Sequence, residues 1–261
     1  MSRLIATAAL TLLSCGALLC QPSYSAASIV NLADQSAGPY APNSLLSIFG
    51  TGLAYSARSL TSADVVGGSV PTLLNGVQVM VDGSPAPLFY VSPGQINFLM
   101  PPNRIAGPVT IWTVLNSTAG PLVTITLQAA APALFASAAD PGFAVAQQWP
   151  LYGVIAPESP APPGAIVILY ATGLGPTEPY PVMPAEIPTF AGEIVQFADL
   201  RVLLNGAPLP ASQVLYAGIC PNFAGLYQID LILPADAPLN PQIQVAMADA
   251  VSAPGLALAV Q

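Results

Sequence analysis

The sequence of 261 residues contains no histidine and no lysine, and four arginines stand against 12 acidic residues. Without histidine, Ser-His-Asp and Cys-His catalytic groups and histidine-ligated metal sites are excluded. Without lysine, Ser-Lys dyads and Schiff-base chemistry are excluded. The net charge of −8 makes a nucleic-acid partner unfavourable, because binding of its phosphates requires clustered basic residues. Glycine-rich phosphate loops, dinucleotide fingerprints and calcium-loop spacings are missing as well. We therefore assign no catalytic, cofactor-binding or metal-binding residues from sequence.

Charge is scarce throughout, whereas apolar residues make up 54% of the chain, and proline and glycine contribute 30 and 21 residues. Internal proline removes a helix hydrogen bond and clashes with the preceding turn. Abundant Val, Ile, Leu and Thr between Pro/Gly turns is typical of short strands. Disordered chains are instead rich in charge and poor in apolar residues. The composition predicts a globular all-β protein.

Residues 1–27 have the layout of a secretory signal peptide, with Arg3, an apolar run over 4–20 and a polar segment with small residues at candidate cleavage positions. The apolar run is shorter than the ~20 residues of a membrane helix, so we expect cleavage and export to the periplasm, the cell surface or the medium. The alternative is lipoprotein processing at Cys15, which ends a lipobox-like Leu-Leu-Ser-Cys. No second apolar run of membrane length follows.

Cleavage leaves one cysteine, Cys220, so we expect no intrachain disulfide. The nearest basic residue in sequence is Arg201, and no histidine is present to activate a thiol. A buried Cys220 is therefore favoured over a reactive one.

Four blocks of the chain recur in one order, which indicates an internal duplication. The matched ranges are 42–54 with 163–175, 77–91 with 200–217, 95–101 with 228–234, and 120–127 with 254–260. The second copy carries extra residues after Tyr216, in "YAGICPNFAGLYQ", where the first has "YVSPGQ". Each copy opens a strand with a glutamine, Gln95 or Gln228, which we expect to hydrogen-bond to a neighbouring turn.

The repeats predict two tandem immunoglobulin-like β-sandwich units, at 28–132 and 163–261, of about 100 residues each. Residues 133–162 are predicted to form a connecting hairpin that turns at Asp140-Pro141-Gly142, followed by a Pro-rich tether. Because this tether is more structured than a flexible linker, the two units are expected to pack with limited freedom.

The ordered motifs resemble an uncharacterised C-terminal domain family of exported proteins of Solibacter-type Acidobacteria. They are "APNSLLSIFGTGLA", "VQVMVDGSPAPLFYVSPGQINFLMP", "PPGAIVILYATGLGP" and "VLYAGICPNFAGLYQIDLILP", and the resemblance runs from about residue 30 to the end. Single units also resemble TIG/IPT-type immunoglobulin folds. The resemblance implies an exported domain without an established activity, so it supplies no catalytic residues. Cys220 departs from the family, which usually has a cysteine-free segment there.

Two functional classes remain open. The first is a non-enzymatic structural, adhesive, or protein- or glycan-binding module at the cell surface. Tyr55 and Arg58 of the first copy, and Tyr180 and Phe190 of the long loop in the second, are its candidate ligand contacts.

The alternative is a carboxylate-dependent, glycosidase-like hydrolase that uses acids of the 176–195 loop. Its candidates are Glu178, Glu186 and Glu193, and the chemistry requires two of them about 5 to 10 Å apart in a cleft. We favour the non-enzymatic class, because nothing in the sequence brings two of these acids together.

Overall fold

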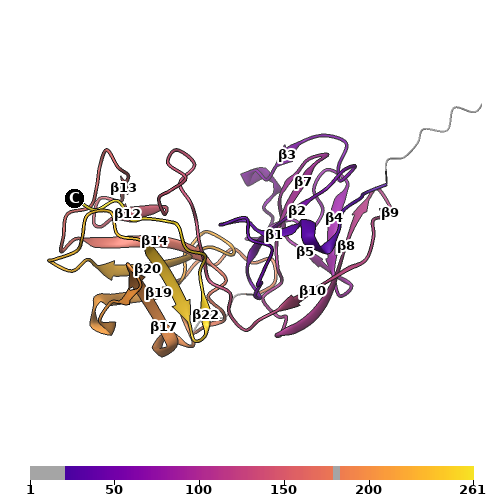
Figure 1. Cartoon of the computed structure of the whole chain (residues 1–261). Coiled ribbons are helices and arrows are strands. Elements are labelled where there is room, and N and C mark those ends of the chain that lie inside the picture. The colour runs from indigo at the N-terminus through magenta and orange to yellow at the C-terminus, as the bar shows by residue number, and fades with distance from the viewer. Residues whose placement is uncertain (1–20, 179–182) are drawn as a thin grey trace, which may run out of the picture.

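The protein is all-β, as predicted, and forms two lobes that lie side by side (Figure 1). The computed structural model describes residues 21–178 and 183–261. Most of the predicted signal peptide, residues 1–20, lies outside these ranges. The described helical segments are four 3-10 turns of three residues, and none has the length and hydropathy of a membrane span. They are η1 (Ala26–Ser28), η2 (Ser62–Asp64), η3 (Phe197–Asp199) and η4 (Ala211–Gln213).

The first lobe is a sandwich of two antiparallel sheets. The β2 sheet has the order β1 (Ile29–Asn31), β2 (Leu45–Phe49), β7 (Gln95–Leu99), β6 (Leu88–Val91) and β3 (Arg58–Ser59). The β8 sheet has the order β10 (Val123–Leu127), β8 (Gly107–Leu115), β4 (Val77–Val81) and β5 (Ser84–Ala86), with β9 (Thr118–Ala119) paired to β8. Alternate residues of both sheets point inward to form one apolar core, which includes Ile48, Val79, Phe98 and Ile111.

The second lobe repeats this arrangement with a larger first sheet. The β14 sheet has the order β13 (Gly153–Ile155), β12 (Ala146–Gln148), β14 (Ile166–Thr172), β20 (Tyr227–Ile232), β19 (Val214–Ile219), β16 (Gly192–Ile194) and β15 (Thr177–Glu178), with β11 (Ala133–Leu134) paired to β14. The β17 sheet has the order β18 (Ala207–Pro208), β17 (Leu200–Leu204), β21 (Ile243–Met247) and β22 (Ala250–Val251). Its core includes Leu169, Val202, Ile229 and Val245.

The duplication extends to irregularities of the backbone. The central order β2-β7-β6 of the first lobe matches β14-β20-β19 of the second. The pairing of β6 with β7 shifts register between Leu88 and Tyr90, and the pairing of β19 with β20 shifts between Val214 and Tyr216. A bulge therefore inserts one extra residue at the same place in each copy, Phe89 in the first and Leu215 in the second.

The two strand-opening glutamines form hydrogen bonds other than the predicted ones. Gln95 donates from Nε2 to Oδ1 of Asn97 at 2.7 Å, and Gln228 donates to both carboxylate oxygens of Asp230 at 3.4 Å. Residues two apart on a strand point to the same side of the sheet, so these side chains are neighbours. The partner is therefore on the same strand, and the expected bond to a turn is wrong.

Residues 21–27, at the end of the predicted signal peptide, contact the first sandwich. Ser23 pairs with Thr51 through two backbone hydrogen bonds. The Tyr24 hydroxyl donates to the Pro121 carbonyl at 2.7 Å and accepts from the Thr113 N–H at 2.8 Å. Cleavage within or after this segment would remove these contacts, and the cleavage position stays a prediction.

Residues 133–162 contribute three strands, β11, β12 and β13, to the β14 sheet. Its first part turns at Asp140–Phe143, where the Phe143 N–H donates to the Asp140 carbonyl and Ala136 bridges Ala144. In Figure 1 the β12–β13 hairpin lies along one side of the second lobe. The segment predicted as a tether therefore extends the second sandwich.

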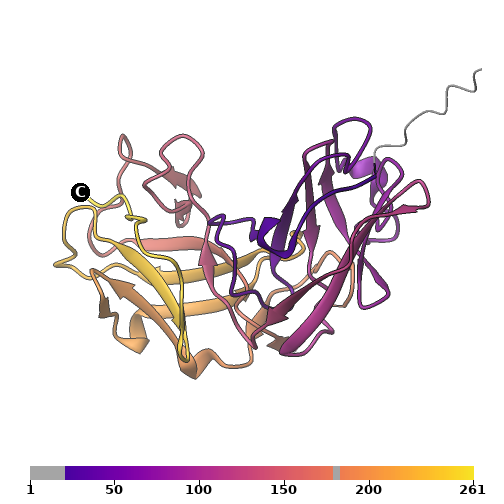
Figure 2. The same cartoon turned by 45° about the vertical axis from the view of Figure 1, so that its right-hand side comes forward.

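The two lobes are joined by a third apolar cluster. It combines Leu45 and Leu99 of the β2 sheet with Ala224 of the segment inserted in the second copy. The Leu45 N–H donates to Oγ1 of Thr172, and that hydroxyl donates to the carbonyl of Gly225. Figure 2 shows strands of the second lobe running up to the first at this junction. The insertion after Tyr216 thus forms part of the contact between the two copies.

Candidate functional site

The outer side of the β14 sheet is the most distinctive surface of the second lobe. Core residues of β14 and β20 alternate with side chains that point away from the core, because successive strand residues face opposite sides. We call the outward-facing side chains of β12, β14, β20 and β19 the open face. They are Gln147, Ile166, Ile168, Tyr170, Gln228, Asp230, Ile232, Leu215 and Tyr216.

The first copy has the same face, but there it is partly covered. Leu45 and Leu99, a cross-strand pair, correspond to Ile166 and Ile232 of the second copy. Leu45 and Leu99 are buried against the second lobe, and the bulge residue Phe89 packs on the same cluster. Its equivalent Leu215 is 47% exposed. Ile168 in the middle of the face is buried, but Ile166 and Ile232 are partly exposed, so the second lobe leaves more of this surface in solvent than its twin does.

A recess of about 430 Å³ opens beside one end of the open face. Three aromatic side chains line it, Phe135, Tyr170 and Phe223, together with Gln147 and smaller apolar residues. Phe223 is 58% exposed and comes from the inserted segment. The Tyr170 hydroxyl donates to Oε1 of Gln147, whose Nε2 donates to the Tyr152 carbonyl, so the polar edge of the recess is fixed in place.

A second recess, of about 230 Å³, lies toward the other end of β14. Trp149, Ile166, Ile168, Leu215 and Asp230 line it. Trp149 is 46% exposed and makes an edge-to-face contact with Tyr152, with ring centroids 5.4 Å apart. Such a contact restrains the indole without covering it. The open face thus carries an aromatic group at each end.

Ionisable groups of this face are shifted by burial. Burial raises the pKa of the Asp230 carboxyl, an effect that the hydrogen bond from Gln228 opposes. Burial, with the charge of Asp230 added, raises the pKa of Tyr216 to about 12. Burial likewise raises the pKa of Tyr170. Both phenols are protonated at neutral pH and act as hydrogen-bond donors, whereas the carboxylate acts as an acceptor.

Cys220 is buried, as the sequence favoured, with 8% of its surface exposed. Burial, followed by the charge of Asp230, raises the pKa of its thiol to about 11. A protonated, covered thiol is a poor nucleophile. Cys220 therefore lacks the features of an activated thiol.

The described candidate contacts named from sequence lie on both lobes, and none of them lines a recess described here. Tyr55 is 56% exposed on the first lobe, and Arg58 forms an ion pair with Asp64. Hydrogen bonds from Thr61 lower the pKa of Asp64, and Arg58 adds to the effect. Phe190 is exposed on the second lobe, and Tyr180 lies outside the described residues. Sequence reasoning missed Trp149, Tyr170 and Phe223, although their aromatic character was a usable signal.

Two of the three candidate acids are neighbours. Glu178 and Glu193 are direct cross-strand partners in β15 and β16, where Cβ atoms are typically about 5 Å apart. Both side chains are exposed, and neither lines any of the recesses described here. Glu186 instead bridges Ser69 of the first lobe through its backbone. Within the described residues, the acid pair therefore lies on exposed strand positions outside these recesses. Among the described residues, no group of three acids or cysteines is placed to hold a metal ion.

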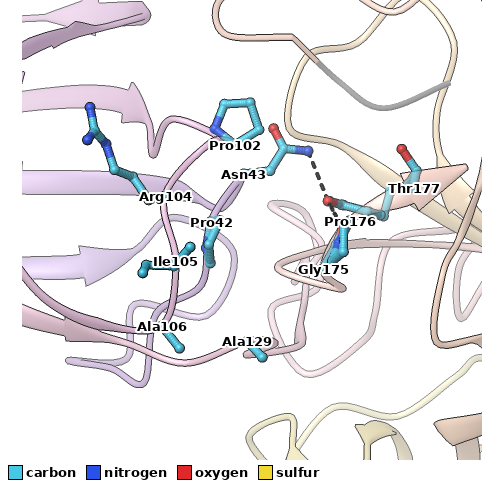
Figure 3. Close-up of a pocket in the computed structure, with 11 residues that line it drawn as sticks. Pro42, Asn43, Pro102, Arg104, Ile105, Ala106, Ala129, Gly175, Pro176 and Thr177 are labelled. Atoms are coloured by element: carbon cyan, nitrogen blue, oxygen red, sulfur yellow. Dashed lines mark hydrogen bonds between the residues drawn. The ribbon is translucent and has the colours of Figure 1, made fainter.

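A third recess, of about 290 Å³, lies between the lobes (Figure 3). Its walls are largely proline and small apolar residues, with Asn43 on one side and Gly175 on the other. Asn43 donates from Nδ2 to the Tyr227 hydroxyl at 2.9 Å, and that hydroxyl donates to the Gly175 carbonyl at 2.6 Å. Arg104 is on the first-lobe wall, with its guanidinium directed away from Gly175 (Figure 3). The central polar groups of this recess thus hold the two lobes together.

Comparison with protein-family models gives no match, and comparison with curated protein sequences gives none. The resemblance to the acidobacterial family therefore stays a prediction. Among solved structures, the chain is similar to a surface glycan-binding protein of Prevotella bryantii, at 13% identity and a TM-score of 0.28. That match covers 90% of this chain and 41% of the other, so this chain spans less than half of that protein.

Two further solved structures are similar. A Bacteroides ovatus surface glycan-binding protein in complex with a mixed-linkage heptasaccharide matches at 15% identity and a TM-score of 0.22, over 89% of this chain and 47% of the other. Domains 5–6 of the S-layer protein SbsC match at 10% identity and a TM-score of 0.25, over 92% and 98%. Superpositions at these TM-scores carry no functional argument, so function is argued below from the chain's own surface.

Proposed function

We propose that this protein is an exported, non-catalytic carbohydrate-binding module whose ligand lies on the open face of the second sandwich. The observation that carries the proposal is the 430 Å³ recess lined by Phe135, Tyr170 and Phe223. A pyranose ring has an apolar C–H face and polar edges. Aromatic rings match the face, and fixed amide and hydroxyl groups match the edges, as in small-molecule sites generally.

The polar edge of the recess supports the same chemistry. Gln147 is held by Tyr170 and by the Tyr152 carbonyl, so its orientation is set before a ligand arrives. A preorganised donor and acceptor lose little entropy on binding. The recess places the exposed Phe223 beside the partly exposed Phe135 and Tyr170, and contiguous apolar surface of this kind commonly marks an interaction site.

A hydrolase is the less supported function. Glu178 and Glu193 face each other on exposed strands, away from the aromatic recesses. Glycoside hydrolysis requires one carboxyl group to be kept protonated in a cleft beside the sugar. An exposed pair without such a cleft does not meet this requirement, so catalysis is assigned to none of the acids.

Export is part of the proposal and follows from the predicted signal peptide. A binding protein of low charge and without a disulfide is then stabilised by its two packed cores and by the cluster between them. The compartment is the periplasm, the cell surface or the medium.

The test is a glycan array followed by calorimetric titration of the oligosaccharides that bind. We expect F223A and Y170A to weaken binding about tenfold each, because an aromatic contact contributes about 1.5 kcal/mol. Y55A removes a tyrosine of the first lobe that is about as exposed as Phe223, and it should leave binding unchanged. Absence of binding to every glycan, or equal affinity of wild type and F223A, would refute the proposal.

A further inference from the structure

The internal duplication provides a reference for Asp230. Its equivalent in the first copy is Asn97, since both follow a strand-opening glutamine by two residues. The Oδ1 of Asn97 has two donors: it accepts from Gln95 at 2.7 Å and from the Ser47 hydroxyl at 2.9 Å. The amide is thus a structural element of the first sheet.

In the second copy, both hydrogen bonds to this side chain differ from those of the first. Ile168 stands directly opposite Asp230, where the first copy has Ser47 opposite Asn97, so the hydroxyl donor is lost. Only Gln228 remains, at 3.4 Å from both carboxylate oxygens, which is long for a hydrogen bond to a charged acceptor. A carboxylate has about four acceptor positions, so most of those of Asp230 have no partner among the described residues.

The Asp230 carboxylate lies at a recess lined mostly by apolar side chains. Asp230 shares the 230 Å³ recess with the exposed Trp149 and with Leu215, the bulge residue that is uncovered in this copy. No cationic residue lines this recess or the larger one. Burying a carboxylate among apolar side chains without a strong partner costs free energy, and a ligand with hydroxyl donors would offset that cost.

We propose that Asp230 and Trp149 form a subsite for a neutral sugar ring. The carboxylate accepts hydrogen bonds from two adjacent ring hydroxyls, while the apolar face of the ring packs on the indole. The inference rests on the proposed function and specifies its ligand class. Neutral glycans are bound, and uronic or sulfated glycans are rejected, because their charge would meet Asp230 without a compensating arginine in a chain of net charge −8.

The two recesses lie toward opposite ends of β14, on one side of the sheet. Ile166 lines the smaller recess and Tyr170 the larger, four residues further along the strand. At a rise of about 3.3 Å per residue, Ile166 is about 13 Å from Tyr170 along the strand, and Ile168, which also lines the smaller recess, is about 7 Å from it. The two recesses therefore follow one another along β14, so the ligand class is an oligosaccharide that spans both.

The test compares D230N with E193Q in titrations against a neutral oligosaccharide from the array and its uronic counterpart. Both substitutions remove one negative charge. Glu193 lies on the neighbouring strand β16, opposite Gly218 of β19, but lines neither recess. It is therefore the matched control for long-range electrostatics.

We expect D230N to weaken binding of the neutral ligand about tenfold or more, because hydrogen bonds to a charged acceptor are among the stronger ones. E193Q should change the affinity less than about twofold, as expected for an exposed charge. W149A should weaken binding, and wild type should not bind the uronic counterpart. Thermal melts of each variant confirm that it is folded.

The outcomes separate the two proposals. If F223A loses affinity while D230N and E193Q behave alike, the subsite is refuted and carbohydrate binding stands. The subsite is also refuted if the wild type binds a uronic sugar more tightly than a neutral one. The same holds if D230N loses affinity only for a protonated amino sugar. If wild type binds no glycan, the proposed function fails and the subsite fails with it.

Discussion

Substitution of Gly225 by alanine is expected to destabilise the junction between the two lobes. Gly225 lies in the segment inserted in the second copy, at φ +76°, a conformation that costs an alanine about 1–2 kcal/mol. An added Cβ would lie 2.4 Å from Cδ1 of Leu99 and 3.0 Å from Cγ of Leu45, both in the first lobe. Overpacking of this kind costs about 1–3 kcal/mol, which gives a total of about 2–5 kcal/mol.

Gly206 provides the matched control. It has φ +79° in the turn between β17 and β18, and an added Cβ there would have no atom within 4 Å. G206A therefore carries the backbone cost alone. Differential scanning calorimetry should give a lower Tm for G225A than for G206A, by about 2–4 °C for each kcal/mol of the contact cost. Equal melting temperatures would refute the assignment of the inserted segment as the contact between lobes.

Three further outcomes follow from the structure. D230N should raise the Tm at pH 7 and lose this advantage near pH 3. Burial raises the Asp230 pKa in the folded state, so the stability of the wild type falls as the pH rises from the unfolded-state pKa through the folded-state pKa. A Tm gain of D230N that grows toward pH 3 would contradict this. In protein that retains residues 21–27, Y24F should cost about 1–3 kcal/mol in urea unfolding, because it removes a donor to Pro121 and leaves the buried Thr113 N–H unpaired; an unchanged midpoint would contradict the contact. Cys220 should react with a thiol reagent at pH 8 far more slowly in the native protein than in urea, because burial raises its pKa to about 11; equal rates would show an accessible thiol.

Local patterns were sufficient for the architecture. The strands β4 and β17 are directly followed by Asp82-Gly83 and Asn205-Gly206, dipeptides typical of tight hairpins, and each strand forms one. The ordered recurrence of four blocks gave the duplication, which the shared sheet order and the two bulges confirm. Such features follow from a few adjacent residues, so they can be inferred from sequence.

The candidate site could not be inferred in this way. Trp149 comes from the β12–β13 turn, Tyr170 from β14 and Phe223 from the inserted segment, so they gather only after the β14 sheet has formed. The sequence pointed instead to the loop acids and to Tyr55 and Arg58. Cross-strand register alone determines that Glu178 faces Glu193 on an exposed surface.

By itself the sequence determined that this is an all-β protein of two copied units without histidine or lysine chemistry. Turn residues, alternation and composition act locally and do not depend on distant contacts. Only the tertiary structure decided which copy presents its outer sheet to solvent. That difference arises because Ala224, from the second copy's insertion, packs onto Leu45 and Leu99 of the first, whereas the equivalent Ile166 and Ile232 of the second keep part of their surface in solvent.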